Sequence, residues 1–225
     1  MAKKKQVKIA PSILAGDFGK LADEAKRIEE SGADAIHFDV MDGHFVPNLT
    51  LGPKALAAIN RTTDMFLDVH LMMYSPFDYV QRFVEAGADN ITFHFEATED
   101  VEDTINFIKK CNISAGLAFC PETSESMVPQ FLPLCDKVLL MTVHPGFGGQ
   151  GFIKEVLEKI RLTKEICDKQ NLDVDIQVDG GITDKTAKLC LEAGANDIVA
   201  GTYCFTAPEG MKAAVKSLRG DYGNQ

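Results

Sequence analysis

Two histidines and two aspartates have the residue types and the spacing that a divalent metal requires. His37 and Asp39 lie two residues apart in one apolar run, and His70 lies in a second. In a β-strand, residues two apart point to the same face, so His37 and Asp39 would be directed alike and His70 could join them from another strand. Asp179 ends a third apolar run, just before two glycines. Imidazoles and carboxylates that converge on one point indicate a divalent metal site.

A single inward-facing histidine or aspartate is more often a hydrogen-bonded core residue than a metal ligand. The metal interpretation depends on the four residues coinciding at the ends of several strands. Asp68 shares a face with His70, and we interpret it as a buried polar partner, because an unpaired buried charge is costly. Asp42 is assigned to hydrogen bonding within a loop. Packing or supporting contacts are expected for His44, His94 and His144.

A regular framework must position these side chains, and the chain shows one. Apolar, β-branched runs alternate with amphipathic segments from end to end, without a linker. A short motif, which we call the repeated phrase, occurs at residues 31–36 and again, with variations, at 86–91 and 193–198. It is typical of a helix that ends at glycine before a buried strand. We expect strands around residues 9–12, 35–41, 66–72, 91–95, 115–120, 138–143, 176–179 and 198–201, and helices that include 20–30, 77–85, 101–110, 152–170 and 185–192.

Eight such units, joined by right-handed crossovers, can close into a (β/α)₈ TIM barrel. This α/β, single-domain barrel is the fold we predict. A doubly wound open sheet is the alternative, but no G-x-G-x-x-G motif follows the first strand. In such a barrel the carboxyl ends of the strands carry the function, and the four metal-ligand candidates fall there.

The composition indicates one globular domain over residues 1–225, with a core from about 7 to 218 and flexible termini. The net charge of −10 argues against a nucleic-acid partner, which would require clustered Lys and Arg. No apolar run approaches the roughly 18 residues of a membrane span. Six cysteines without a C-x-x-C pair, and no secretory segment at the start, predict reduced thiols in a cytoplasmic protein.

Glycines gather after the last three predicted strands. Residues 145–151 follow the sixth, Gly180 and Gly181 follow the seventh, and Gly201 with Thr202 ends the eighth. Turn chemistry alone could account for any one of these groups. The loops after strands seven and eight of such barrels commonly bind phosphate through backbone amides, so together they predict a phosphate site. The long loop beside them has the composition of a lid.

Five segments together resemble the signature segments of the ribulose-phosphate 3-epimerase family. The resemblance extends from about the first strand to the eighth and covers nearly the whole chain. Two of the segments are long and specific to that family. The five are residues 11–14 (PSIL), 37–48 (HFDVMDGHFVPN), 68–72 (DVHLM), 143–151 (VHPGFGGQG) and 178–182 (VDGGI).

This resemblance implies a barrel of the ribulose-phosphate-binding type that interconverts D-ribulose 5-phosphate and D-xylulose 5-phosphate in the pentose phosphate pathway, commonly as a homo-oligomer. It implies one divalent metal bound by His37, Asp39, His70 and Asp179, with Zn²⁺ expected first and Fe²⁺, Mn²⁺ or Co²⁺ equally suited to the ligands. Asp39 and Asp179 would also be the acid/base pair. The implied substrate contacts are Ser12, His70, Met41, Met72, Met141 and Asp179, a lid of Gly146, Phe147, Gly148 and Gly149, and a phosphate grip of Gly180, Gly181, Gly201 and Thr202.

The chemistry agrees with these roles. Inverting C3 of a ketose removes a proton beside the carbonyl and returns one to the opposite face, so two acid/base groups on opposite sides are needed. Metal bound to the substrate oxygens would stabilise the enediolate between these steps. The sequence departs from the family pattern at His144, where Asn is frequent, and at Thr202 and Tyr203, where Ser and Ala are usual. Thr202 keeps the hydroxyl of Ser. Tyr203 is bulkier than Ala, so the sequence alone does not predict how its side chain packs.

Three alternatives differ in substrate or class. A ketohexose-phosphate 3-epimerase, acting on allulose 6-phosphate for example, shares the segment at residues 37–48, but the glycine doublets 148–149 and 180–181 favour the pentulose enzyme. A metal-dependent hydrolase would keep an open coordination position, often beside an H-x-H pair, which the chain lacks. The third alternative is a phosphate-binding barrel without catalysis or metal.

Overall fold

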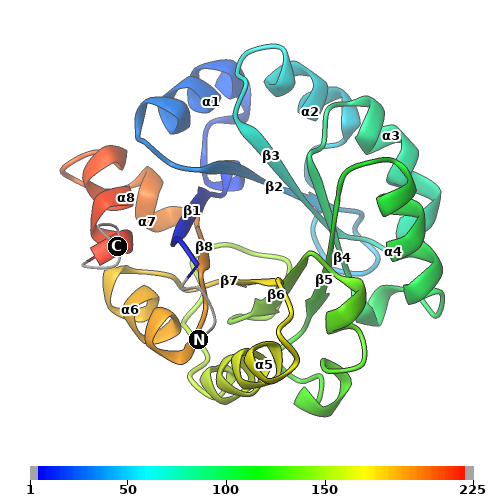
Figure 1. The fold of residues 1–225 in the computed structure, drawn as a ribbon. Coiled ribbons are helices and arrows are strands. Elements are labelled where there is room, and N and C mark those ends of the chain that lie inside the picture. Colours follow the sequence, from blue (N-terminus) through cyan, green and yellow to red (C-terminus); the bar gives the residue numbers. More distant parts are fainter. Residues whose placement is uncertain (1–4, 221–225) are drawn as a thin grey trace.

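Eight parallel strands form the centre of the molecule, inside a ring of helices (Figure 1). The computed structural model describes residues 5–220, and the expected flexible termini lie mainly outside this range. The sheet order is β1-β8-β7-β6-β5-β4-β3-β2, and a bridge between Ser12 and His37 joins its two edges. The predicted barrel is thereby confirmed. Its strands are β1 (Lys8–Pro11), β2 (Ala35–Met41), β3 (Phe66–Met72), β4 (Asn90–His94), β5 (Ser114–Phe119), β6 (Lys137–Met141), β7 (Asp175–Asp179) and β8 (Asp197–Ala200).

The helices follow the strands in the order that a barrel requires, with two differences from the sequence-based expectation. The segment expected to be helical from residue 152 becomes helical only at Val156, because the N–H of Ile153 donates to the carbonyl of Thr142 (2.9 Å) and holds the chain against the sheet. Residues 76–79 form a 3₁₀ turn before the next helix. The α-helices are α1 (Leu21–Glu30), α2 (Pro53–Asn60), α3 (Val80–Glu85), α4 (Val101–Lys110), α5 (Val156–Gln170), α6 (Asp184–Ala193), α7 (Thr202–Phe205) and α8 (Met211–Arg219).

The repeated phrase has a structural role in each of its three copies. Gly32, Gly87 and Gly194 all adopt positive φ and end their helices. Two residues later, an Asp or Asn side chain accepts a hydrogen bond from the first part of the neighbouring strand. The three bonds run from Ile9 N to Asp34 Oδ2 (2.7 Å), from Leu67 N to Asp89 Oδ2 (2.8 Å) and from Ile176 N to Asn196 Oδ1 (2.8 Å). The phrase therefore sets both the turn and the register of adjacent strands.

Alternate residues of β2 and β3 face different environments, as the period of a strand requires. Phe38 and Leu71 pack in the main apolar core against the helices. Met41 and Met72 belong to a separate apolar group at the carboxyl end of the barrel. Below them the barrel interior is polar and fully enclosed, since Asp68, Asn90, Lys137, Gln177 and Asp197 are all buried there.

Two expectations drawn from composition also concern these residues. In the described range, 5–220, no helix has the length and apolar character needed to cross a membrane. All six cysteines lie in this range and form no disulfide with one another, and four of them are buried. The cysteines therefore contribute to packing rather than to a covalent framework.

Candidate metal centre and active site

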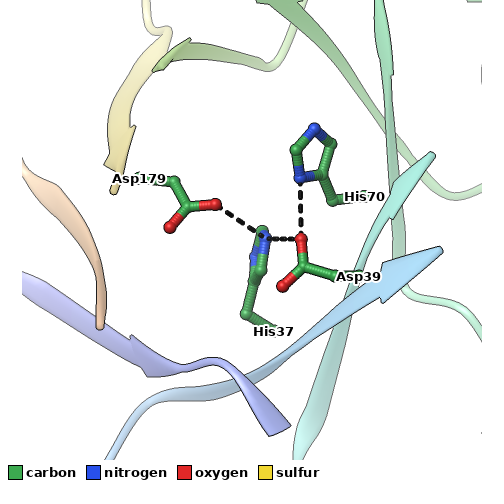
Figure 2. A group of neighbouring side chains, drawn as sticks. All are labelled: His37, Asp39, His70 and Asp179. Atoms are coloured by element: carbon green, nitrogen blue, oxygen red, sulfur yellow. Dashed lines mark hydrogen bonds and ion pairs between the residues drawn. The ribbon is translucent and has the colours of Figure 1, made fainter. Parts of the chain in front are cut away.

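The carboxyl ends of three strands bring the four metal-ligand candidates together (Figure 2). One ligand atom from each of His37, Asp39, His70 and Asp179 lies within 4.8 Å of the others. Nε2 of His37 is 3.3 Å from Oδ1 of Asp39 and 3.9 Å from Oδ2 of Asp179. Nδ1 of His70 is 2.9 Å from the same oxygen of Asp39. The cluster expected from the spacing of these residues is therefore formed by the fold.

The donor atoms of this cluster suit a divalent cation. Nε2 of His37 is buried and has no hydrogen-bond partner among the described residues. Its other nitrogen, Nδ1, lies 2.9 Å from Oδ2 of Asp68, and such a carboxylate holds a proton on that nitrogen and orients the ring. Although burial opposes protonation, the charge of Asp39 raises the pKa of His37 well above its ordinary value. The site thus favours a positive charge where Nε2 meets the two carboxylates, and a metal would supply it.

The two aspartates of the cluster have opposite acid strengths. For Asp39, burial disfavours the charged form, but the charge of His37 and the contacts of its carboxylate with the imidazoles of His37 and His70 outweigh it and hold the pKa well below its usual range. For Asp179, burial and the negative charge of Asp39 together raise the pKa to about 7. One carboxylate is therefore set up to be ionised and the other to carry a proton.

Three hydroxyl groups position these carboxyl groups. Ser12, which the resemblance already placed near the substrate, donates from Oγ to Oδ2 of Asp39 (2.6 Å). Thr50 donates to the backbone carbonyl of Asp39 (2.9 Å), and Thr142 donates to that of Asp179 from both its N–H (2.8 Å) and its Oγ1 (2.9 Å). No local pattern of residues signals the two threonines, because their roles depend on contacts with residues distant in the chain.

A cavity of about 440 Å³ opens directly above the cluster. Asp39 and Asp179 reach its wall, whereas His70 is fully buried and lies outside the lining. The substrate contact of His70 therefore stays a prediction, and the structure places this imidazole behind the cavity wall, against Asp39. The other expected substrate residues all line the cavity: Ser12, Met41, Met72, Met141, Gly146, Phe147, Gly148, Gly149, Gly180, Gly181, Gly201 and Thr202.

The glycines after β7 allow backbone to form one wall of this cavity. Gly180 and Gly181 have φ of +116° and +64°. A Cβ at Gly180 would clash with the side chain of Val143, and one at Gly181 would lie 2.7 Å from the backbone nitrogen of Phe152. In the described part of the chain, the N–H groups of Gly181 and Gly201 make no hydrogen bond to a protein acceptor. These amides are available to an anion in the cavity.

The glycine-rich loop after β6 is held at several points. Asn48 donates from Nδ2 to the carbonyl of Gly146 (2.9 Å), and Gln150 donates from Nε2 to the carbonyls of His144 (2.6 Å) and Phe147 (2.8 Å). The ring of Phe147 remains about half exposed at the rim. The loop therefore lies along the border of the cavity, which is the position that a lid would occupy.

The two departures from the family pattern are accommodated outside the cluster. The exposed ring of His144 pairs through Nδ1 with Oε1 of Glu122 (2.5 Å), so it lies at the rim of the cavity. The hydroxyl of Tyr203 is 2.9 Å from Oγ of Ser217 in α8, so the phenol extends away from the cluster. Asp42 accepts three backbone hydrogen bonds, from His44, Phe45 and Tyr74, which agrees with its expected loop role.

An eight-stranded parallel barrel with its cavity and acidic cluster at the carboxyl ends of the strands defines a (β/α)₈-barrel enzyme. The family model described as the ribulose-phosphate 3 epimerase family matches residues 8–205. The chain belongs to this family and is an isomerase. The resemblance seen in the sequence is thus confirmed.

Known relatives extend over the whole barrel. The chain is 51% identical to "Ribulose-phosphate 3-epimerase" of Chlamydia muridarum, over 97% of this chain and 97% of that one. It is 46% identical to the protein of the same name from Bacillus subtilis, over 95% of this chain and 99% of the relative. A solved structure of 3-hexulose-6-phosphate synthase superposes with a TM-score of 0.66 at 18% identity, over 96% of this chain and 98% of that one, and it bears on the fold alone.

Proposed function

We propose that the protein interconverts D-ribulose 5-phosphate and D-xylulose 5-phosphate by proton transfer at C3, with Asp39 and Asp179 as the acid/base pair. The observation that carries this proposal is the pair of carboxyl groups on the non-adjacent strands β2 and β7, buried for Asp39 and partly buried for Asp179, whose acid strengths are driven apart. His37, Asp39, His70 and Asp179 would hold one divalent metal. When bound, that metal supplies Lewis acidity toward the negative charge that develops on the substrate oxygens.

The two aspartates divide the proton transfer between the faces of C3. Asp39, ionised and held by Ser12, removes the proton from one epimer and leaves an enediolate. Asp179 begins as the acid and delivers its proton to the opposite face, which inverts the carbon. In the reverse reaction the roles exchange, and the near-neutral pKa of Asp179 suits both tasks.

The walls of the cavity assist by excluding water and gripping the phosphate. Met41, Met72 and Met141 are at most 5% exposed and present a dry, polarizable surface to the planar intermediate. The chain carries a net charge of −10, so phosphate affinity must come from local donors. We assign that role to the backbone at Gly180, Gly181, Gly201 and Thr202, beneath a lid of Gly146, Phe147, Gly148 and Gly149.

Several further expectations accompany this proposal. Zn²⁺ remains the first candidate, since two imidazoles and two carboxylates also suit Fe²⁺, Mn²⁺ and Co²⁺. A homo-oligomer acting in the cytoplasm, within the pentose phosphate pathway, remains our expectation, and sedimentation of the purified protein would test the assembly. The relatives named as ribulose-phosphate 3-epimerases support the pentulose over the hexulose substrate.

The decisive experiment is an epimerase assay on ribulose 5-phosphate with metal content measured on the same sample. We expect about one metal ion per chain, loss of activity with a chelator, and recovery when metal is returned. In deuterated water, C3 of the product should carry deuterium. A higher kcat/KM for allulose 6-phosphate would reassign the substrate, and full activity in metal-free protein would remove the metal from the proposal.

A further inference from the structure

A second group of titratable side chains lies beside the candidate metal centre, on β4 and the loops after β4 and β5. It consists of His94, Glu96 and Cys120. His94 is fully buried, and its Nε2 is 2.9 Å from Nε2 of His70. On the other side of the ring, Nδ1 of His94 is 3.1 Å from Oε2 of Glu96. The three residues Glu96, His94 and His70 therefore form one continuous hydrogen-bonded chain that ends at the cluster.

The direction of the hydrogen bonds in this chain follows from Glu96. Its Oε2 contacts His94, and its Oε1 accepts from Oγ1 of Thr123 and from the backbone N–H of Cys120 (2.8 Å). The contact with His94, together with these two donors, lowers the pKa of Glu96 to about 2, despite the opposing effect of burial. An ionised carboxylate can only accept, so the Nδ1 of His94 must carry a proton. In a neutral His94 the lone pair is then on Nε2.

This lone pair determines the tautomer of His70. Two nitrogens 2.9 Å apart form a hydrogen bond only if one of them donates, so when the lone pair of His94 is on Nε2, the proton of His70 lies on its own Nε2. The lone pair of His70 is left on Nδ1, which faces Oδ1 of Asp39 at 2.9 Å (Figure 2). A lone pair and a carboxylate oxygen repel each other unless a cation lies between them. The arrangement therefore favours a cation at the point where these two atoms meet.

We propose that the Glu96–His94 pair fixes His70 in the tautomer whose Nδ1 binds the metal, so that both are positioning residues of the metal centre. The inference rests on the proposed function, because it assumes the metal ligands named there. It also accounts for the orientation of His70: its imidazole contacts His94 on the side away from Asp39, as the ring of His37 contacts Asp68.

The same three side chains do not make a separate metal site. Both oxygens of Glu96 are already hydrogen-bonded, and Nε2 of His94 is occupied by His70. Burial and the negative charge of Glu96 raise the pKa of the Cys120 thiol far above its ordinary value, so the thiolate that a metal would need is disfavoured. Sγ of Cys120 lies 3.5 Å from Nδ1 of His94, and Cys120→Ala removes this thiol but keeps the backbone N–H that donates to Glu96, so it offers a matched control.

The test is the zinc affinity of the full-length protein, measured by competition with a chromophoric chelator. Glu96→Gln removes the charge that fixes His94, and His94→Phe keeps a ring against Phe45 but removes the acceptor for His70. We expect both variants to bind Zn²⁺ about 10- to 100-fold more weakly than wild type. Cys120→Ala should stay near the wild-type affinity. Thermal unfolding identifies any variant that fails to fold, in which case Glu96→Gln decides the matter.

A second readout reports the tautomers directly. ¹⁵N NMR of the zinc-loaded protein should find the proton of His70 on Nε2 and that of His94 on Nδ1, a result that simple packing would not require. The opposite tautomers, or wild-type zinc affinity in both variants, would overturn the inference while leaving the proposed function intact. A wild-type protein that binds no zinc, manganese, iron or cobalt would instead overturn the metal centre itself.

Discussion

The carboxyl groups of Asp39 and Asp179 line one cavity and both lie close to Nε2 of His37, yet their pKa values move in opposite directions. The cause is their partners. Asp39 lies against the imidazoles of His37 and His70, whereas Asp179 is partly buried next to a charge of its own sign. Two chemically identical side chains thereby differ in the way that the proposed inversion of a carbon centre requires.

Replacing either aspartate should stop epimerisation but leave half of the proton chemistry. Asp39→Asn and Asp179→Asn each remove a proton carrier while keeping its shape, so we expect kcat to fall by about 10³-fold or more. Each variant should still exchange C3 hydrogen with deuterated water in the one epimer whose C3–H faces the remaining aspartate. NMR of each sugar phosphate measures this exchange. Near-wild-type turnover in either variant would contradict the two-carboxylate assignment.

The free energy of unfolding of metal-free protein should depend on pH in the way that the raised pKa of Asp179 predicts. Its pKa is raised from 3.8 to about 7, so the folded chain keeps a proton that the unfolded chain releases in this interval. The stability contributed by this group is complete below about pH 4 and is lost as the pH rises toward 7. Relative to Asp179→Asn, the wild type should therefore lose at most about 1.4 kcal/mol of unfolding free energy per pH unit there. Urea unfolding in the presence of chelator, from pH 4.5 to 7.5, measures the difference, and parallel curves would refute it.

The buried ammonium of Lys137 should be essential to the barrel interior. Nζ lies 3.0 Å from Oδ1 of Asp68 and 2.9 Å from Oδ2 of Asp197, with the side chain only 7% exposed. Lys137→Met leaves two buried carboxylates without their cation and should cost about 3–5 kcal/mol. Lys8→Met is the matched control, because its pair with Asp175 is half exposed and is worth at most about 1 kcal/mol.

Denaturant unfolding of the two lysine variants compares the pairs directly. Adding Asp197→Asn to Lys137→Met should recover part of the loss, because it removes one of the unpaired charges. Equal losses of unfolding free energy in Lys137→Met and Lys8→Met would show that the buried ion pairs of Lys137 stabilise the protein no more than the exposed pair of Lys8.

The phosphate grip can be tested at a position where the fold itself tolerates a side chain. Gly201 has φ of −90°, and a Cβ there would lie no closer than 3.4 Å to Ala15. Gly201→Ala should keep the melting temperature but raise KM about tenfold, a loss of about 1.4 kcal/mol in phosphate contact. Inorganic phosphate should become a correspondingly weaker competitive inhibitor. An unchanged KM would place the phosphate elsewhere, and Gly19→Ala, in the short 3₁₀ helix at residues 18–20 and outside the cavity lining, serves as the control.

The sequence predicts the metal cluster well because it depends on local periodicity. His37 and Asp39 share a face for the same reason that any residues two apart in a strand do, and the parallel order of the strands brings His70 alongside. The strand count and the barrel followed from the alternation and from the repeated phrase. These features need no knowledge of how distant strands are aligned.

The remaining features depend on register between strands, which local patterns do not encode. Lys137 is an ordinary basic residue in the sequence, and only the enclosed barrel brings it between Asp68 and Asp197. The contacts of Thr142 with Asp179 arise in the same way. The start of α5 was placed too early, because apolar spacing continues through residues 152–155 while a hydrogen bond to the sheet holds them out of the helix.

The bridge from Ser12 to His37 joins the first strand to the second, and Ser12 also donates to Asp39. The seam of the barrel therefore runs through the reaction centre. A chain whose first strand has not yet docked lacks both the closed barrel and the hydrogen bond from Ser12 that orients Asp39, the proposed base. We therefore expect such incompletely folded molecules to have no epimerase activity. Appearance of activity during refolding would in this way report closure of the barrel at this seam.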